Sequence, residues 1–571
     1  MPAIAACVAD LVVTDGHIYT MDAAKSVIEA MAVAKGAIVA AGSNADVANC
    51  TAKQRVSLAG HTVFPGFIDA HTHPSESGTE LQTVDLTTVV NLDELVLTTK
   101  SWASAHPRAK WVQGGGWDQS IFEGTNPRAL LDAAVPDRPV YLGSADAHSA
   151  WVNTRALTMA GLMETGVPDP AGGRIERDAN GVPTGVLRET ASDAVGDLVP
   201  DYPRAMIDAG TESALAMMRQ FGITTVIDAD APDWVLKAYQ RFDRRRKLTA
   251  RVYAAVSVEP DAGIEQIDGI VAARKRFASD RLHVNAVKFF LDGVIESETA
   301  LMLAPYASGR NGPQQFSPED LDELFEAADD AGLQLHAHAL GDGAVREFLD
   351  AVERLSAHHP ERSRRPIAAH LEVIDPADVP RFGKLAVIAD FQPLWAYPDP
   401  YITKLTTPAI GAARTEWLYP IAAVANAGGR LAAGSDWSVS SMNPWEAIEV
   451  AVTRRDPADS GRGLVPAGTT GGEVVPDAET GAALTSATSD NTLGGALSPH
   501  HAIDLGAIIA AYTTGGAYAV GEEDRLGALT VGRQADFVVV SVDPFTIAAE
   551  ALSDVEVLST WLAGERVYAA E

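Results

Sequence analysis

The stretch that decides the fold covers residues 62–74 and reads Thr62-Val63-Phe64-Pro65-Gly66-Phe67-Ile68-Asp69-Ala70-His71-Thr72-His73-Pro74. Its apolar first half predicts a buried strand, and the strand ends in two histidines. Residues i and i+2 of a strand point to the same side, so His71 and His73 can reach one metal ion. A lone His-x-His pair is more often structural than metal-binding. The interpretation therefore depends on matching residues elsewhere in the chain.

Composition limits the class of protein. The chain has 571 residues, of which 47% are hydrophobic and 21% charged, as in a soluble globular protein with about two or three domains. The formal net charge is -32. We expect neither nucleic acid nor an anionic membrane as a partner, because a phosphate surface requires a basic face. We attribute the acidity to solubility rather than to an acid-specific function.

Cysteines and targeting signals are scarce. Cys7 and Cys50 are the two cysteines, so we expect no disulfide framework and no thiolate metal cluster. Residues 1–10 lack the basic region and long apolar core of a signal peptide. No run approaches the roughly 18 apolar residues of a membrane helix. We therefore expect a cytoplasmic protein.

Both ends of the chain have the pattern of small antiparallel sheets. Short alternating segments separated by glycines occur between residues 10 and 61 and again between residues 527 and 568. We expect residues 1–62 and 525–571 to form one β-sandwich domain. A central domain would then cover residues 63–524.

The central region alternates apolar strand-like runs with amphipathic helical segments, which is typical of a parallel α/β sheet. Eight runs are strand candidates, the number that closes a (β/α)8 TIM barrel: Val63–Ala70, Thr224–Asp228, Arg251–Val256, Val284–Leu291, Leu333–Ala339, Ile367–Glu372, Val387–Gln392 and Leu431–Asp436. Residues from about 76 to 205 are too many for an unstructured loop and predict an inserted subdomain. A long loop is expected at about 455–500.

Chemistry in such a barrel lies at the C-terminal ends of the strands. The expected strand ends carry polar side chains that can bind metal: His71, His73, Lys288, His338, His370 and Asp436. Imidazoles and a carboxylate on one concave face suit one or two divalent ions, with zinc the expected metal.

Lys288 lies in the apolar segment 287–293, where an unpaired ammonium group is costly to bury. Desolvation lowers the pKa of such an amine. The neutral amine can take up carbon dioxide and give a carbamate, which offers oxygens to two metal ions. The alternative is an ion pair with Asp292 or Asp436.

Six stretches resemble, in the same order, the amidohydrolase superfamily. The resemblance is to the family 3 group that includes YtcJ-like proteins and N-substituted formamide deformylase. The stretches are residues 65–73, 148–153, 177–185, 287–293, 338–342 and 434–437. They span nearly the whole chain.

The resemblance implies a one- or two-metal site at the mouth of the barrel. In that pattern His71, His73 and Asp436 bind the more buried ion. The carbamate of Lys288 bridges, and the histidines of the fifth and sixth strands, His338 and His370, bind the second ion.

This sequence departs from the family pattern at two positions. Relatives commonly carry an acidic residue just before the histidine of the sixth strand, where this chain has Ala369. His336 also forms a second His-x-His pair with His338, which leaves open which of the two coordinates.

The expected mechanism uses a metal ion that brings the pKa of bound water towards neutrality. Asp436 would accept a proton from the attacking water and pass it to the departing amine. His148 is a second catalytic candidate. Trp117, Trp151 and Trp395 are candidates for binding the substrate, although tryptophans more often pack in a core.

The sequence thus predicts hydrolysis of carbon–nitrogen bonds other than peptide bonds, in a small linear or cyclic amide such as an N-formyl or N-acyl amine. A deaminase is an alternative, but Ala339-Leu340-Gly341-Asp342 follow His338 where deaminases usually carry a glutamate. A lactonase or esterase is another alternative. A non-catalytic scaffold is disfavoured because all the ligand candidates are present. We expect a homo-oligomer, with a dimer favoured.

Overall fold

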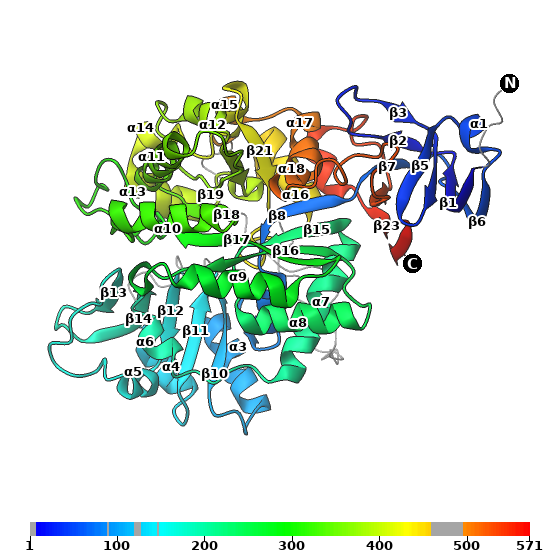
Figure 1. Ribbon diagram of the computed structural model, residues 1–571. Coiled ribbons are helices and arrows are strands. Elements are labelled where there is room, and N and C mark those ends of the chain that lie inside the picture. The colour runs from blue at the N-terminus through cyan, green and yellow to red at the C-terminus, as the bar shows by residue number, and fades with distance from the viewer. Residues whose placement is uncertain are drawn as a thin grey trace.

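The computed structural model describes residues 7–87, 89, 91–118, 127–145, 148–457 and 495–570. Three parts are evident in the ribbon (Figure 1): a central barrel, an insert below it, and a β-rich part beside it that contains both chain ends. The predicted long loop falls largely on residues 458–494, which lie outside the described residues.

The barrel is a sheet of eight parallel strands in the order β21-β20-β19-β18-β17-β16-β15-β8. They are β8 (Phe67–Thr72), β15 (Ile223–Asp228), β16 (Arg251–Ser257), β17 (Leu282–Phe290), β18 (Gln334–Ala339), β19 (Ile367–His370), β20 (Ile388–Phe391) and β21 (Arg430–Ala433). Each overlaps one strand candidate of the sequence. The predicted α/β barrel is therefore confirmed.

Helices cover the outside of the barrel, because each strand–helix crossover buries an apolar helix face against the sheet. The principal ones are α7 (Arg204–Gln220), α8 (Asp233–Arg244), α9 (Gln266–Phe277), α10 (Pro318–Asp330), α11 (Asp342–His358), α12 (Val379–Leu385), α15 (Ile421–Asn426) and α16 (Pro444–Thr453). Shorter helices near the barrel are α2 (Pro74–Glu80), α13 (Thr407–Ile410), α14 (Ala412–Thr415), α17 (Leu505–Ala510) and α18 (Gly516–Ala519).

The first and last strands meet where the barrel closes. The backbone N–H of Asp436 donates to the carbonyl of His71 at 2.7 Å, and that of His73 donates to the carbonyl of Trp437 at 3.1 Å. Gly434 permits this approach, because a Cβ there would lie 2.5 Å from the backbone nitrogen of His71. The closure brings the residues that follow β21 beside those at the end of β8.

The insert is built on a six-stranded sheet in the order β13-β14-β12-β11-β10-β9. Its strands are β9 (Val84–Asp85), β10 (Val112–Trp117), β11 (Val140–Ser144), β12 (Ser149–Val152), β13 (Gly173–Arg177) and β14 (Pro183–Glu189). Its helices are α3 (Leu92–Ala105), α4 (Pro127–Ala134), α5 (Thr154–Met159) and α6 (Asp193–Gly196).

Two sheets enclose an apolar core in the β-rich part, and both chain ends contribute to it. One sheet has the order β5-β4-β1-β6 and the other β24-β23-β22-β7-β2-β3. Leu11, Val33, Phe537 and Trp561 are buried together in the shared core. The strands are β1 (Val8–Thr14), β2 (His17–Tyr19), β3 (Val27–Ile28), β4 (Ala30–Ala34), β5 (Ala37–Gly42), β6 (Thr51–Ser57), β7 (Thr62–Pro65), β22 (Phe537–Val540), β23 (Val557–Leu562) and β24 (Glu565–Ala569), with α1 (Asn44–Val47) between β5 and β6.

The sequence offers no reason to expect a disulfide framework, but the two cysteines do pair. Cys7 and Cys50 form a disulfide bond, although 43 positions separate them in the sequence. The cause is the parallel pairing of β1 with β6, in which the backbone N–H of Thr51 donates to the carbonyl of Cys7 at 2.8 Å. This pairing brings the two Cα atoms to 4.4 Å.

Within the described parts of the chain, no helix is both long and apolar enough to cross a bilayer.

The disulfide should stabilise the β-rich part. Closing a loop of 43 residues is worth about 4 kcal/mol in the chain-entropy model, so Cys50→Ser should lower the unfolding temperature of this part. Protein denatured without reductant should show no free thiol in a thiol titration. Two free thiols per chain would contradict the bond. A Cys7→Ser, Cys50→Ser variant, whose melting should not respond to reductant, is the control.

Candidate active site

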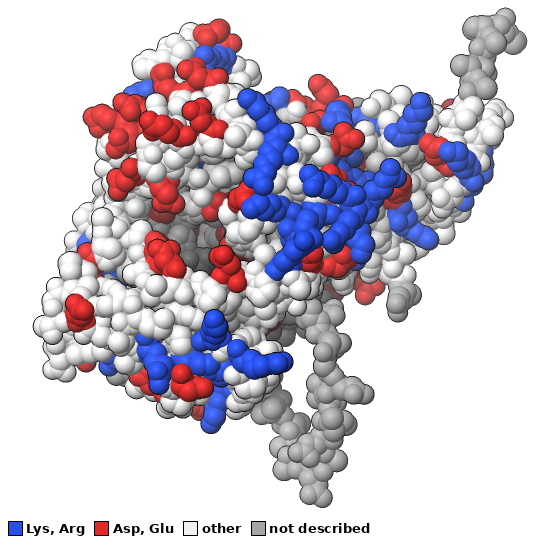
Figure 2. All heavy atoms as spheres, turned by 60° about the horizontal axis from the view of Figure 1, so that its bottom comes forward, with Lys and Arg blue, Asp and Glu red and all other residues white. Residues whose placement is uncertain are grey.

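A cavity of about 1240 Å³ opens at the C-terminal ends of the barrel strands, and both the barrel and the insert line it. Figure 2 shows a hollow in this face of the molecule, with Asp and Glu side chains around its rim. The deep wall comes from the barrel and includes His71, Lys288 and His338. The opposite wall comes from the insert and includes Gly115 and Ser144.

His71 lies fully buried at the end of β8. Its Nε2 is 3.2 Å from Nζ of Lys288 and 3.7 Å from Oδ1 of Asp436, and its Nδ1 is 3.0 Å from Nε2 of His336. One edge of the ring therefore faces the centre of the site. The other edge is held from behind by His336.

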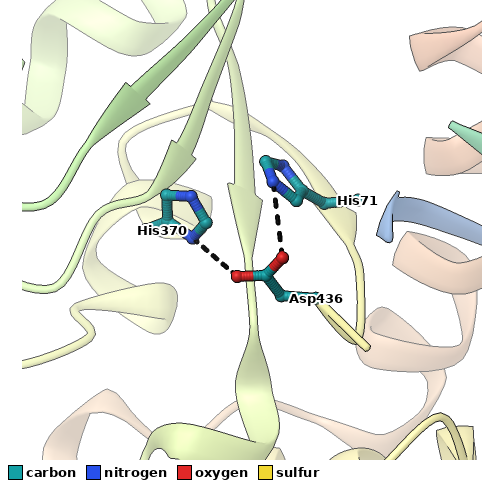
Figure 3. A group of neighbouring side chains, drawn as sticks. All are labelled: His71, His370 and Asp436. Carbon is teal, nitrogen blue, oxygen red and sulfur yellow. Dashed lines mark ion pairs between the residues drawn. The ribbon is translucent and has the colours of Figure 1, made fainter. Parts of the chain in front are cut away.

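His370 and Asp436 complete a compact group with His71, and the three side chains point toward one another (Figure 3). One ligand atom from each lies within 4.8 Å of the others. Both His370 and Asp436 have left-handed backbone, with φ of +75° and +51°. Such strain in a non-glycine residue persists only where the surrounding structure enforces it, and it is common at functional sites.

His73 and His338 flank this group. Nε2 of His73 lies 3.2 Å from Oδ1 of Asp436. Nδ1 of His338 lies 3.2 Å from Oδ1 of Asp292, which also accepts the backbone N–H of Leu340 at 3.1 Å. The Asp292 carboxylate thus orients His338, a role that the sequence did not reveal.

Two further residues that sequence reasoning missed hold histidines of the site. Oε1 of Gln392, just beyond β20, lies 2.9 Å from Nδ1 of His370. Oε2 of Glu189, the last residue of β14, lies 2.8 Å from Nδ1 of His148. The signal for Gln392 was its place at the end of a barrel strand. Glu189 follows shortly after the motif at residues 177–185.

His148 reaches the cavity from the insert, and its ring centroid lies 5.1 Å from that of His338. The insert therefore brings a sixth imidazole to a site that otherwise belongs to the barrel. His336 forms a deeper group with His71 and Asp390, whose ligand atoms are also mutually within 4.8 Å. Of the pair left open by the sequence, His338 lines the cavity and His336 contacts the back of His71.

The three candidate tryptophans lie in different environments. Trp395 lines the cavity and stacks on His370 at a centroid distance of 5.6 Å. Trp117 and Trp151 are not among the described residues that line the cavity, and their role in substrate binding stays a prediction. They are fully buried in the core of the insert.

Burial sets the protonation of the site. It lowers the pKa values of His71, His338 and His370 well below the ordinary value, so these rings are neutral and offer lone pairs. Burial lowers the pKa of Lys288 to about 8, against the opposing effect of Asp436. Burial would also lower the pKa of His73, but the hydrogen bond to Asp436 and the negative charges of Asp436 and Asp228 together raise the pKa to about 9.

Comparison with models of protein families shows to which family the chain belongs. The model described as "Amidohydrolase family" matches residues 54–568. The chain belongs to the amidohydrolase family. This agrees with the resemblance found in the sequence motifs.

This amidohydrolase is similar over nearly its whole length to proteins from several organisms. It is 29% identical to Protein LONG AFTER FAR-RED 3 of Arabidopsis thaliana, covering 99% of this chain and 92% of that protein. It is 28% identical to the putative amidohydrolase YtcJ of Bacillus subtilis (97% and 98% covered) and 25% identical to N-substituted formamide deformylase of Arthrobacter pascens (97% and 97% covered).

A solved structure shares the fold. The uncharacterized metal-dependent hydrolase from Pyrococcus horikoshii OT3 superposes with a TM-score of 0.71 at 22% sequence identity, covering 94% of this chain and 99% of that one.

The donor set of this amidohydrolase fits a divalent metal ion. Nε2 of His370 is buried and, within the described part of the chain, has no hydrogen-bond partner. Its ring lies beside the carboxylate of Asp436, with Nδ1 3.8 Å from Oδ2. Buried neutral imidazoles next to a carboxylate form a ligand set suited to a divalent metal ion.

Metal affinity should rise with pH. His73 carries a proton at pH 7, because its pKa in the metal-free protein is about 9. A metal ion that binds His73 must displace this proton, so the affinity for zinc should rise about tenfold per pH unit between pH 7 and 9. Calorimetry in carbon-dioxide-free buffers of different ionisation enthalpy would count the protons released. His73→Ala should bind zinc more weakly and lose this slope, whereas a pH-independent affinity of the wild type would contradict the assignment.

Proposed function

We propose that this amidohydrolase is a metal-dependent hydrolase of carbon–nitrogen bonds other than peptide bonds. Its substrates would be small linear or cyclic amides, including N-formyl or N-acyl amines. The observation that carries the proposal is the group of His71, His370 and Asp436, whose ligand atoms converge beside a cavity large enough for a small molecule. The name of the N-substituted formamide deformylase, a relative over nearly the whole chain, supports an amide substrate.

Residues at the ends of the barrel strands would hold the metal. His71, His73 and Asp436 would bind one zinc ion, and His338 and His370 would bind a second. When bound, a divalent ion lowers the pKa of water and polarises a carbonyl group. With the ion bound, the residues that face the centre could promote hydrolysis of an uncharged amide at neutral pH.

We propose that Lys288 is carbamylated. Its pKa of about 8 leaves part of the amine neutral near pH 7. The Nζ lone pair would attack carbon dioxide, form an N–C bond and release one proton. The resulting carboxylate would face Nε2 of His71, now 3.2 Å from Nζ.

Asp436 would move the proton of the reaction. Its carboxylate lies between the two ligand groups, 3.2 Å from His73 and 3.8 Å from His370. It would accept a proton as water adds to the carbonyl carbon. It would donate that proton to the nitrogen as the carbon–nitrogen bond breaks, so that a carboxylic acid and an amine leave.

Trp395 would form one wall for the substrate. Its ring stacks on His370 with an interplanar angle of 3° and lines the cavity. A flat apolar surface beside a metal ligand would orient the acyl or amine part of a small amide.

Two further expectations stay predictions. A homo-oligomer, with a dimer favoured, is proposed by analogy with the superfamily. The cytoplasmic location also stays a prediction, and the Cys7–Cys50 disulfide favours an oxidising compartment instead.

Metal analysis of Lys288→Ala tests the proposal. The wild type purified with zinc and bicarbonate should hold about two ions per chain, and Lys288→Ala should hold one or none because the bridging group is lost. The control is Lys237→Ala, which removes a lysine of the same cavity that pairs with Asp233 on α8. This control should keep the metal content of the wild type.

The same proteins should be assayed with N-formyl amines, acylated amino acids, hydantoins and lactones. Hydrolysis of at least one amide by the wild type is expected, with a loss of at least tenfold in Lys288→Ala. Absence of metal after reconstitution, together with inactivity on the whole panel, would overturn the hydrolase proposal.

A further inference from the structure

A row of three side chains connects the insert to the barrel at the edge of the cavity. Nδ1 of His148 lies 2.8 Å from Oε2 of Glu189, and both residues belong to the insert. The hydroxyl of Thr299, in the barrel loop after β17, donates to Oε1 of Glu189 at 2.5 Å. The two oxygens of the Glu189 carboxylate thus have different partners on the two sides of the junction.

This row is shielded from solvent. The exposed fractions of the His148 and Glu189 side chains are 16% and 10%, and the residue Thr299 as a whole is 6% exposed. Burial alone would raise the pKa of Glu189, but the contacts with His148 and Thr299 lower it below the ordinary value. The carboxylate is therefore an anion held inside the junction.

The backbone is adapted to this arrangement. Glu189 has a left-handed backbone with φ of +49°, and its N–H donates to the carbonyl of His148 at 2.9 Å. A strained conformation in a glutamate requires support from its surroundings. The two residues are joined both through the backbone and through their side chains.

The barrel leaves room for the carboxylate by means of a glycine. A Cβ at Gly293 would lie 2.3 Å from both Oε1 of Glu189 and Oγ1 of Thr299. Gly293 ends the stretch 287–293 that also carries Lys288. Gly293, five positions after Lys288, is therefore small because the insert docks against it.

The contact with Glu189 involves one particular nitrogen of the His148 ring. Its Nδ1 faces Glu189, and Nε2 lies on the opposite edge of the ring. The ring lines the cavity beside His338. When a carboxylate accepts Nδ1–H, the tautomer and the orientation of an imidazole are fixed, so Glu189 holds this ring at the cavity wall.

We propose that Glu189, anchored by Thr299, is the positioning residue that holds the imidazole of His148 at the cavity beside His338, where the ring contacts the carbonyl group or the departing amine of the substrate. The inference rests on the proposed hydrolase function and deepens it. The insert supplies a catalytic group, and a barrel residue sets the geometry of that group.

A double-mutant cycle tests this role. The wild type, His148→Ala, Glu189→Gln and the double variant would be assayed with N-formyl-4-nitroaniline, an amide whose hydrolysis releases a coloured amine. Glu189→Gln should lower kcat about 10- to 100-fold, the usual effect of removing an orienting partner, with KM and metal content unchanged. In the His148→Ala background the same change should cost no further activity, because the group that Glu189 orients is absent.

Two controls separate positioning from mere support of the fold. Thr299→Ser should retain activity and Thr299→Val should lose it in the same way as Glu189→Gln. Glu176→Gln alters another carboxylate of the insert, which pairs with Arg174 and Arg188, and should leave kcat unchanged. In a crystal structure of Glu189→Gln, the ring of His148 should leave its orientation.

The outcomes are distinguishable. Additive losses in the cycle, or an unmoved His148 ring in Glu189→Gln, would overturn this inference while leaving the hydrolase proposal intact. A wild type that binds metal but hydrolyses neither this anilide nor any amide of the panel would overturn the proposed function itself.

Discussion

The hydrogen bond from the backbone of Asp436 to the carbonyl of His71 is the constraint on which the site depends. It joins the ends of the first and last barrel strands, with 2.7 Å between the nitrogen of Asp436 and the oxygen of His71. Only glycine at position 434 lets the two strands approach so closely. The same contact fixes Asp436 in a left-handed conformation and aims its carboxylate at His71 and His73. Closure of the barrel and the arrangement of the candidate metal ligands therefore depend on the same contact.

Desolvation explains why the centre favours a cation. Several imidazoles and a carboxylate are buried together, and burial keeps the rings neutral. Asp292 lies against Nδ1 of His338 and Gln392 against Nδ1 of His370, so each ring is held by a polar partner. A buried polar atom without a partner is costly, and a divalent ion satisfies several of them at once. The outer partners also fix each ring before the ion arrives, which reduces the entropy lost on binding.

The sequence predicted what depends on local pattern and on position along a strand. The eight barrel strands and the ligand candidates at their ends were found, because alternation of apolar runs and helices is periodic and parallel strands end on one face. The Cys7–Cys50 bond and the contact of Glu189 with Thr299 were missed, because each depends on segments paired only in the folded chain. The burial of Trp117 and Trp151 in the core of the insert was not apparent either, because a motif does not show which side of a sheet a residue faces.

The cavity divides the task between two parts of the chain. The barrel provides the candidate metal ligands, whose identity governs which bond can be broken. The insert provides the facing wall, including the backbone of Gly114 and Gly116, where a Cβ would meet Val84 or Thr87 within 2.5 Å. The candidate ligands and the facing wall therefore have separate origins in the chain. A substitution in the insert can reshape the cavity without moving the side chains that the barrel strands hold.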